Sequence, residues 1–145
     1  RDPSPTRWQP LPGGDGPREV TDPLWWRHGS RALLVHDLLI EEPRWAEPLC
    51  PHRPFLTAEL VHALRHDGAA TFADAMLRRL VHGQGPCLED ACVARAHALF
   101  LRERQWPVDD DPELCRAELR LEVAAITGDL DALRQHAAAG TPARS

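Results

Sequence analysis

Apolar residues recur along most of this chain with the spacing of one helix face, about 3.6 residues per turn. No segment alternates between apolar and polar residues over a useful length, as a half-buried strand would. The pattern predicts helices over residues 24–28, 31–41, 57–67, 71–80, 87–104 and 112–127, with a last short helix over 129–139. The third of these helices begins at either Phe55 or Thr57. The sequence therefore predicts an all-α fold, a small orthogonal bundle of about six helices.

Residues that start or stop helices bound several of these segments. Ser30 is placed to cap the helix that begins at the next residue. Pro43 restricts the residue before it and so ends that helix. Thr71 and Asp74 form a T-x-x-D capping box. Asp111 is a capping residue followed by a proline, which costs nothing at the first helical position.

Two proline-rich segments are predicted to be non-helical. Residues 1–23 contain six of the fourteen prolines and indicate an extended linker or arm. Residues 44–54 contain three more and are predicted to form an ordered loop that Trp45 pins to the core. The sequence thus divides into this arm, a helical domain over residues 24–140 and a tail over residues 141–145.

Composition excludes several classes of protein. At 145 residues the chain fits one domain, of a size that buries about two thirds of its unfolded surface. The net charge is −5 and both signs alternate along the helices, whereas nucleic-acid binding needs a concentrated basic face. The longest apolar run, residues 32–35, is far shorter than the ~20 residues that cross a bilayer. No secretory signal pattern opens the chain, and a start at Arg1 rather than Met favours a fragment of something longer.

Three motifs in order carry a family resemblance. Residues 27–32 read RHGSRA, residues 58–69 read AELVHALRHDGA and residues 71–79 read TFADAMLRR. In sequence and spacing they resemble the C-terminal helical domain of FAD-dependent (aerobic) glycerol-3-phosphate dehydrogenases and alpha-glycerophosphate oxidases. The resemblance covers most of the chain from about residue 11 onward and is weakest after residue 127.

Several positions depart from the family pattern. Leu80 and Val81 stand where the family usually continues with Thr-Arg, and His62 stands where an aromatic residue is usual. Gln105 replaces the glycine before the family's tryptophan, which is Trp106 here. Because Trp106 matches the family and follows an apolar run, it is predicted to be a core anchor.

The resemblance implies a non-catalytic domain of a larger oxidoreductase. The whole enzyme would oxidise sn-glycerol 3-phosphate to dihydroxyacetone phosphate, with FAD taking the hydride and electrons passing to a membrane quinone. Flavin and substrate groups of this family belong to its N-terminal domains, so we expect no catalytic and no cofactor-binding residue here, and residues 1–23 would lead from the absent flavin domain. The glycine cluster at residues 13–16 follows no strand and lacks the context of a dinucleotide-binding loop.

The expected partner is the flavin domain of the parent enzyme, on which this domain would pack and whose fold it would support. Glu59, Asp67, Arg78 and Arg79 are the candidates for docking, since arginine makes planar, bidentate contacts with carboxylates and carbonyls. The domain is expected in the cytoplasm, with its parent enzyme peripheral at the inner face of the cytoplasmic membrane and no membrane insertion by this chain. The alternative is a stand-alone helical protein-interaction module derived from that domain.

A metal site is considered and not predicted. His62 and His66 are four residues apart, one turn after Glu59, and this spacing can present two imidazoles to a metal. A third ligand would have to come from elsewhere in the chain, for example Cys50 or His52. Because the family usually has an aromatic residue at position 62, a packing role is favoured.

The cysteines are expected to be reduced thiols that behave as small hydrophobes. None of Cys50, Cys87, Cys92 and Cys115 forms a C-x-x-C pair. Cys87 and Cys92 with His97 suggest a thiol–imidazole pair, but on one continuous helix a five-residue spacing places the two sulfurs on different faces. No catalytic cysteine is predicted.

Overall fold

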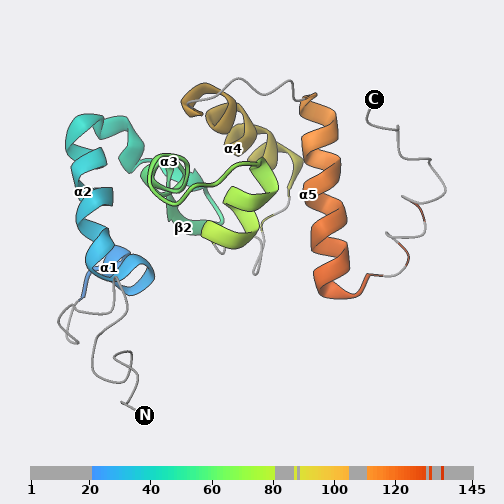
Figure 1. Ribbon diagram of the computed structural model, residues 1–145, viewed down its shortest axis with the longest axis horizontal. Coiled ribbons are helices and arrows are strands. Elements are labelled where there is room, and N and C mark those ends of the chain that lie inside the picture. Colours follow the sequence, from blue (N-terminus) through green and yellow to red (C-terminus); the bar gives the residue numbers. More distant parts are fainter. Residues whose placement is uncertain are drawn as a thin grey trace, which may run out of the picture.

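A computed structural model describes residues 21–80, 87, 89–104 and 111–129, together with Asp131 and Gln135. Within these residues the chain is mostly helical, as predicted, with one small hairpin (Figure 1). The elements in order are α1 (Pro23–His28), the 3-10 turn η2 (Gly29–Arg31), α2 (Ala32–Glu41), the 3-10 turn η3 (Pro43–Ala46), β1 (Pro48–Cys50), β2 (Arg53–Leu56), α3 (Thr57–Arg65), the π-helix η4 (Asp74–Arg79), α4 (Asp90–Glu103) and α5 (Pro112–Thr127).

The hairpin corrects the prediction that residues 44–54 form an ordered loop without strands. Strands β1 and β2 pair antiparallel, with Pro48 opposite Leu56 and Cys50 opposite Arg53. Strands of three and four residues are too short to show a period-two pattern, and prolines can occupy the start or the edge of a strand. Trp45, just before the hairpin, is buried as expected.

Local signals at the helix ends are confirmed in most cases. Thr71 Oγ1 accepts a hydrogen bond from the Asp74 backbone N–H at 3.0 Å, and the Asp74 carboxylate accepts one from Ala70. Asp111 caps α5 through the Glu113 N–H at 2.9 Å. The cap expected from Ser30 is wrong: a 3-10 turn precedes α2, so the N-cap position falls on Arg31.

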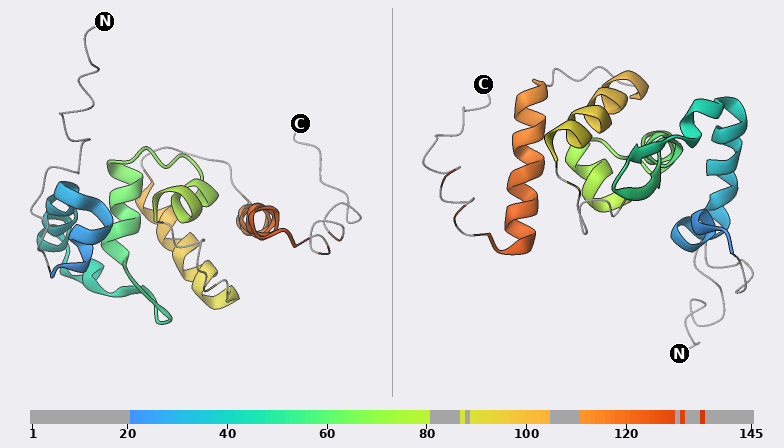
Figure 2. Two further views of the ribbon diagram at one scale, coloured as in Figure 1. Left: turned by 90° about the horizontal axis from the view of Figure 1, so that it is seen from below. Right: turned by 180° about the vertical axis from the view of Figure 1, so that it is seen from behind.

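Helix α3 lies at the centre of the domain, and Figure 1 shows it nearly end-on between α2 and α5. Its residues from Thr57 to Leu64 are all buried, because the helix is covered on every side. Leu60 and Leu64 join the larger core cluster with η4, α4 and α5, whereas Val61 joins a second cluster with α1 and α2. The crossing of these helices, also visible in Figure 2, matches the predicted orthogonal arrangement.

Helix α5 packs against α4 at one end of the domain (Figures 1 and 2). Leu119 and Val123 place its apolar face in the larger core cluster. None of the helices in the described ranges is long and apolar enough to cross a membrane.

Some predicted features lie outside the described residues. They are the proline-rich arm up to residue 20, Trp106, most of the last short helix over residues 129–139, and the tail over residues 141–145. The predicted division into arm, domain and tail therefore stays a prediction.

Candidate functional site

Two groups of polar side chains stand out against the apolar core, and the first is centred on the buried carboxylate of Glu59. This residue is 1% exposed. Arg27 binds it in a bidentate manner, with Nε 2.7 Å from Oε2 and Nη2 2.8 Å from Oε1. His28 Nε2 lies 2.9 Å from Oε2, and the Leu56 backbone N–H donates to Oε1 at 2.8 Å. The Glu59 carboxylate thus ties the end of α1 to the start of α3.

These contacts decide the charge state of Glu59. Burial acts to raise the pKa of its carboxyl, but the bonds from His28, Arg27 and the Leu56 N–H favour the ionised form by more, so the net shift of the pKa is downward. The free-energy cost of burying an ionised carboxylate is offset here by its hydrogen bonds from charged and backbone donors. It is offset only while those donors stay in place. Glu59 is therefore a clamp inside the domain, and it fixes the positions of Arg27 and His28.

A second carboxylate, that of Asp67, lies just after α3. Arg31 Nη1 is 2.7 Å from Oδ1, and His62 Nδ1 is 3.2 Å from Oδ2. Burial acts to raise the pKa of Asp67, but His62 and then Arg31 lower it by more. The His62 ring is 1% exposed and lies 5.2 Å from each of the rings of His28 and His66. His62 is therefore packed among rings, as the family pattern at position 62 suggested.

An open pocket of about 280 Å³ lies beside these carboxylates. Its walls come from α1, η2, α3 with the residues just after it, and the end of η4. Four of the lining residues are arginines: the full set is Arg27, His28, Arg31, His62, Asp67, Arg78 and Arg79. The chain as a whole is acidic, with a net charge of −5, so a basic pocket is a local feature. It is suited to carboxylate or carbonyl groups.

The π-helix η4 presents two of the arginines in this pocket. Its wider turn is marked by the bond from the Leu80 N–H to the Ala75 carbonyl at 2.9 Å. Arg78 Nη2 reaches Glu122 on α5 at 3.0 Å, whereas Arg79 forms no ion pair with any part of the chain that the structure describes. Isolated π turns often occur at functional sites.

The four predicted docking residues thus fall into two groups. Asp67, Arg78 and Arg79 line the same pocket. Glu59 does not line it, and its buried carboxylate supports two residues that do. The geometry argues against a direct contact between Glu59 and a partner, while the docking role of the other three stays a prediction.

A larger open pocket, about 350 Å³, lies between η3 and α4. Its arginines already have carboxylate neighbours, since Arg44 pairs with Glu42 and Arg95 pairs with Glu47. These are exposed pairs that hold no buried polar group. The pocket offers no convergent set of groups for chemistry.

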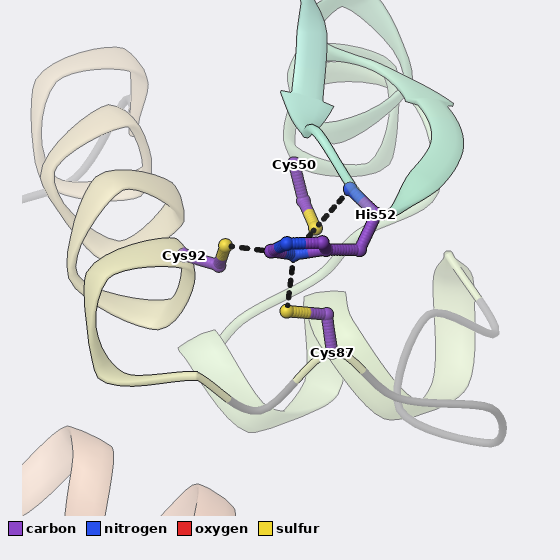
Figure 3. A group of neighbouring side chains, drawn as sticks. All are labelled: Cys50, His52, Cys87 and Cys92. Atoms are coloured by element: carbon purple, nitrogen blue, oxygen red, sulfur yellow. Dashed lines mark hydrogen bonds between the residues drawn. The ribbon is translucent and has the colours of Figure 1, made fainter.

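The second group of polar side chains consists of Cys50, His52, Cys87 and Cys92 (Figure 3). Cys50 ends β1, His52 lies in the hairpin turn, and Cys92 lies in the first turn of α4. The Nδ1 atom of His52 is 3.6 Å from the sulfur of Cys50, 3.0 Å from that of Cys87 and 3.7 Å from that of Cys92. All four potential ligand atoms lie within 4.8 Å of one another.

The expectation that Cys87 and Cys92 face apart is wrong. It assumed one helix from residue 87, but α4 begins at Asp90, so Cys87 precedes the helix and its sulfur points back toward Cys92 (Figure 3). The imidazole beside them belongs to His52. His97 instead lies in the core, with its ring centroid 4.9 Å from that of Phe72.

The electrostatics of the two thiols differ. Burial is the main cause that raises the pKa of Cys92, to about 12, and the neighbouring sulfurs of Cys87 and Cys50 add to it. Burial also acts to raise the pKa of Cys87, but the Glu89 backbone N–H and the side chains of the cluster outweigh it, so that pKa is lowered. One imidazole nitrogen cannot form hydrogen bonds with three neutral thiols at once. Burying the thiols that lack such a bond costs free energy.

Fold and pocket together define a small, mostly helical domain with a basic pocket beside the buried carboxylate of Glu59 and the partly buried one of Asp67. The family profile described as the C-terminal domain of alpha-glycerophosphate oxidase matches residues 4–111. The chain belongs to this family. Membership places it with the oxidoreductases and implies a partner catalytic domain. None of the curated proteins and none of the solved structures gives a significant match.

Helix α5 follows the matched segment, which ends at residue 111. One family departure has a structural reason within the described residues. Leu80, where the family usually has threonine, is 2% exposed in the larger core cluster. Position 80 is therefore used for packing, and Val81 lies outside the described residues.

Proposed function

We propose that this chain is the non-catalytic C-terminal domain of an FAD-dependent glycerol-3-phosphate dehydrogenase. The whole enzyme converts sn-glycerol 3-phosphate to dihydroxyacetone phosphate, with FAD as the hydride acceptor and a quinone as the electron acceptor. Support comes from the family match over residues 4–111 and from the three ordered motifs between residues 27 and 79. FAD belongs to the parent enzyme in this proposal, and none is bound by this chain.

The role of the domain is to pack on the flavin domain and support it. The observation that carries this proposal is the basic pocket, where three arginines from η2 and η4 converge and Arg79 has no ion pair in the described part of the chain. Exposed arginines without partners form bidentate bonds with carboxylates or backbone carbonyls at interfaces. The occupant we propose is an acidic or carbonyl-bearing segment of the flavin domain.

We further propose that the parent enzyme acts at the inner face of the cytoplasmic membrane. Electron transfer to a membrane quinone requires the flavin domain to reach the bilayer surface. In this arrangement the present domain stays on the cytoplasmic side and contributes no membrane insertion.

A charge reversal at Arg79 tests the docking proposal. In the parent enzyme, Arg79→Glu is expected to lower the midpoint of thermal unfolding and the bound flavin per polypeptide, because a like-charge contact at an interface costs several kcal/mol. In the 145-residue chain alone the same change is expected to leave the midpoint nearly unchanged, since no ion pair with the described residues is lost.

Arg95→Glu is the matched control. Arg95 is also an exposed arginine, and its charge reversal removes a surface pair with Glu47, which is worth about 0–1 kcal/mol. The new carboxylate would lie near that of Glu47, but solvent and salt screen the repulsion between two exposed groups. An Arg79→Glu parent enzyme with the stability and flavin content of the Arg95→Glu enzyme would contradict docking through this pocket.

The alternative is a stand-alone helical interaction module derived from the same domain. Its basic pocket would then bind a segment of another protein. The reading frame upstream of residue 1 discriminates the two: a flavin-binding G-x-G-x-x-G sequence supports the first proposal, and a start codon a few residues upstream supports the second.

A further inference from the structure

We propose that Cys50, His52, Cys87 and Cys92 bind one structural Zn²⁺ ion, through three thiolates and Nδ1 of His52. This site is independent of the docking pocket and of the function proposed for the domain. It differs from the metal site considered at His62 and His66, whose rings pack with each other and with His28.

The distances are those of a tetrahedral site. Zinc–sulfur bonds of about 2.3 Å and zinc–nitrogen bonds of about 2.0–2.1 Å place a sulfur and a nitrogen ligand about 3.5 Å apart. The three sulfurs here lie 3.0–3.7 Å from Nδ1 of His52, and Figure 3 shows the ring directed into the space between them. Small adjustments would bring all four to one ion.

Hydrogen bonding alone does not explain this convergence. A neutral imidazole nitrogen carries either one proton or one lone pair, so Nδ1 of His52 can satisfy one of the three sulfurs. The cysteines are 1%, 7% and 8% exposed, which leaves the other two thiols little water to bond. A cation at the centre uses all four groups at once.

The backbone prepares two of the sulfurs to be thiolates. The His52 N–H lies 3.3 Å from the sulfur of Cys50, and the Glu89 N–H bonds the sulfur of Cys87. Cys92 is the third sulfur: burial beside the other two disfavours its thiolate, and its place in the first turn of α4, where the helix dipole favours negative charge, acts in the opposite direction. Such donors stabilise ligands that must give up protons to bind a metal.

A carboxylate also lies near the outer side of the histidine, at a distance longer than a hydrogen bond. Its other ring nitrogen, Nε2, faces Glu89 Oε1 at 3.8 Å. A carboxylate next to the distal nitrogen of a ligating histidine fixes its tautomer and raises its basicity. The His52 side chain is 49% exposed, so an ion has a route to the site.

The kind and number of the ligands indicate that the ion is zinc and that its role is structural. Thiolate and imidazole ligands without oxygen ligands suit Zn²⁺ and not Mg²⁺ or Ca²⁺. Four protein ligands close the coordination sphere, as in structural sites, and leave no position for a substrate. Binding replaces three thiol protons, which are released, and involves no change of oxidation state. The ion would join the β1–β2 hairpin to the start of α4.

A disulfide is the competing use of these cysteines. One bond between two of them would use only two of the four groups, and the third thiol would keep His52 as its neighbour. The structure holds all three as free thiols. The experiment therefore has to separate a metal site from an oxidised pair.

The test is metal analysis of the 145-residue chain, purified under reducing conditions without chelator and without a metal-affinity tag. We expect about one zinc per chain by mass spectrometry. After zinc removal, Co²⁺ should give the visible bands and the sulfur-to-metal charge-transfer band of a tetrahedral thiolate site, and Zn²⁺ should displace it.

Cys92→Ser and Cys115→Ser form a matched pair, because both cysteines are 8% exposed and only the first belongs to the cluster. Cys92→Ser should reduce zinc affinity by more than the ~10–100-fold lost with an outer partner, and Cys115→Ser should retain one zinc. Equal zinc content in the two variants would overturn the proposal.

If Cys92→Ser does not fold, the zinc site can still be tested on the unaltered chain. A strong chelator should lower its thermal midpoint, and Zn²⁺ but not Mg²⁺ should restore it. A chain without stoichiometric metal, without a cobalt–thiolate spectrum, or with a disulfide among these cysteines under reducing conditions overturns the site.

Discussion

Replacing Glu59 with glutamine is expected to lower the free energy of unfolding by about 2–4 kcal/mol at neutral pH, because it removes one partner of a buried charge pair. The Glu59 side chain is fully buried, and its partners Arg27 and His28 have side chains only 24% and 10% exposed. In the variant, the bonds that Arg27 and His28 make with the Glu59 carboxylate cannot both be replaced at little cost by water or by another described carboxylate. Urea denaturation followed by circular dichroism measures the difference.

The loss of unfolding free energy in Glu59→Gln should become smaller as the pH falls. The pKa of Glu59 is lowered in the folded chain from an ordinary value of 4.5. Its contribution is therefore fully present above about pH 4.5 and is lost as the pH falls through the lower folded pKa. The difference between the unaltered chain and Glu59→Gln should be largest near pH 7 and should shrink in strong acid.

Glu41→Gln is the control for this prediction. Glu41 also pairs with an arginine, Arg65 at 3.0 Å, but its side chain is 56% exposed. Such a surface pair contributes about 0–1 kcal/mol, so this variant should be close to the unaltered chain at every pH. If Glu59→Gln behaved like Glu41→Gln, the carboxylate of Glu59 would not be the clamp between α1 and α3.

Truncating Phe100 to alanine should cost about 3–5 kcal/mol, the sum of the lost transfer free energy and the cavity that remains. Phe100 lies on α4 and is completely buried, with its ring centroid 5.6 Å from that of Phe72. A domain of this size has about 5–15 kcal/mol of stability in total. The denaturation midpoint should therefore fall steeply, and part of the chain should be insoluble.

Ile40→Ala removes a smaller, aliphatic group from a position that is 79% exposed, and it should change stability little. Equal midpoints for the Phe100 and Ile40 variants would show that α4 is not packed in the larger core cluster. The corresponding expectation for Trp106 concerns a residue outside the described ranges and stays a prediction.

Burial of Glu59 also bears on how docking and folding are connected in this domain. Arg27 and His28 line the basic pocket, and the carboxylate beneath them holds both side chains in place. A change at Glu59 should therefore disturb the pocket as well as stability. Arg79 makes no such internal bond within the described chain, which is why it separates docking from folding in an experiment.

Local pattern was enough to predict most of the helices and their ends. The 3.6-residue period places Leu60, Leu64, Val93 and Phe100 in the core, where they are buried. Asp111 caps α5 as predicted, because a cap depends on residues two or three positions away. The family assignment likewise rested on ordered motifs that can be read along the chain.

Only the tertiary structure decided which polar residues share a site. His52 and Cys87 are 35 positions apart, and Arg27 and Glu59 are 32 apart. No periodicity relates such residues, because their approach depends on how the helices cross and on the turn of a hairpin too short to be predicted. The position at which α4 begins was also decisive. Because α4 begins at Asp90, Cys87 lies outside the helix and its side chain can face Cys92. The sequence by itself determined the helices and the family, while packing determined the buried clamp, the basic pocket and the cysteine–histidine cluster, because these are made by contacts between distant segments.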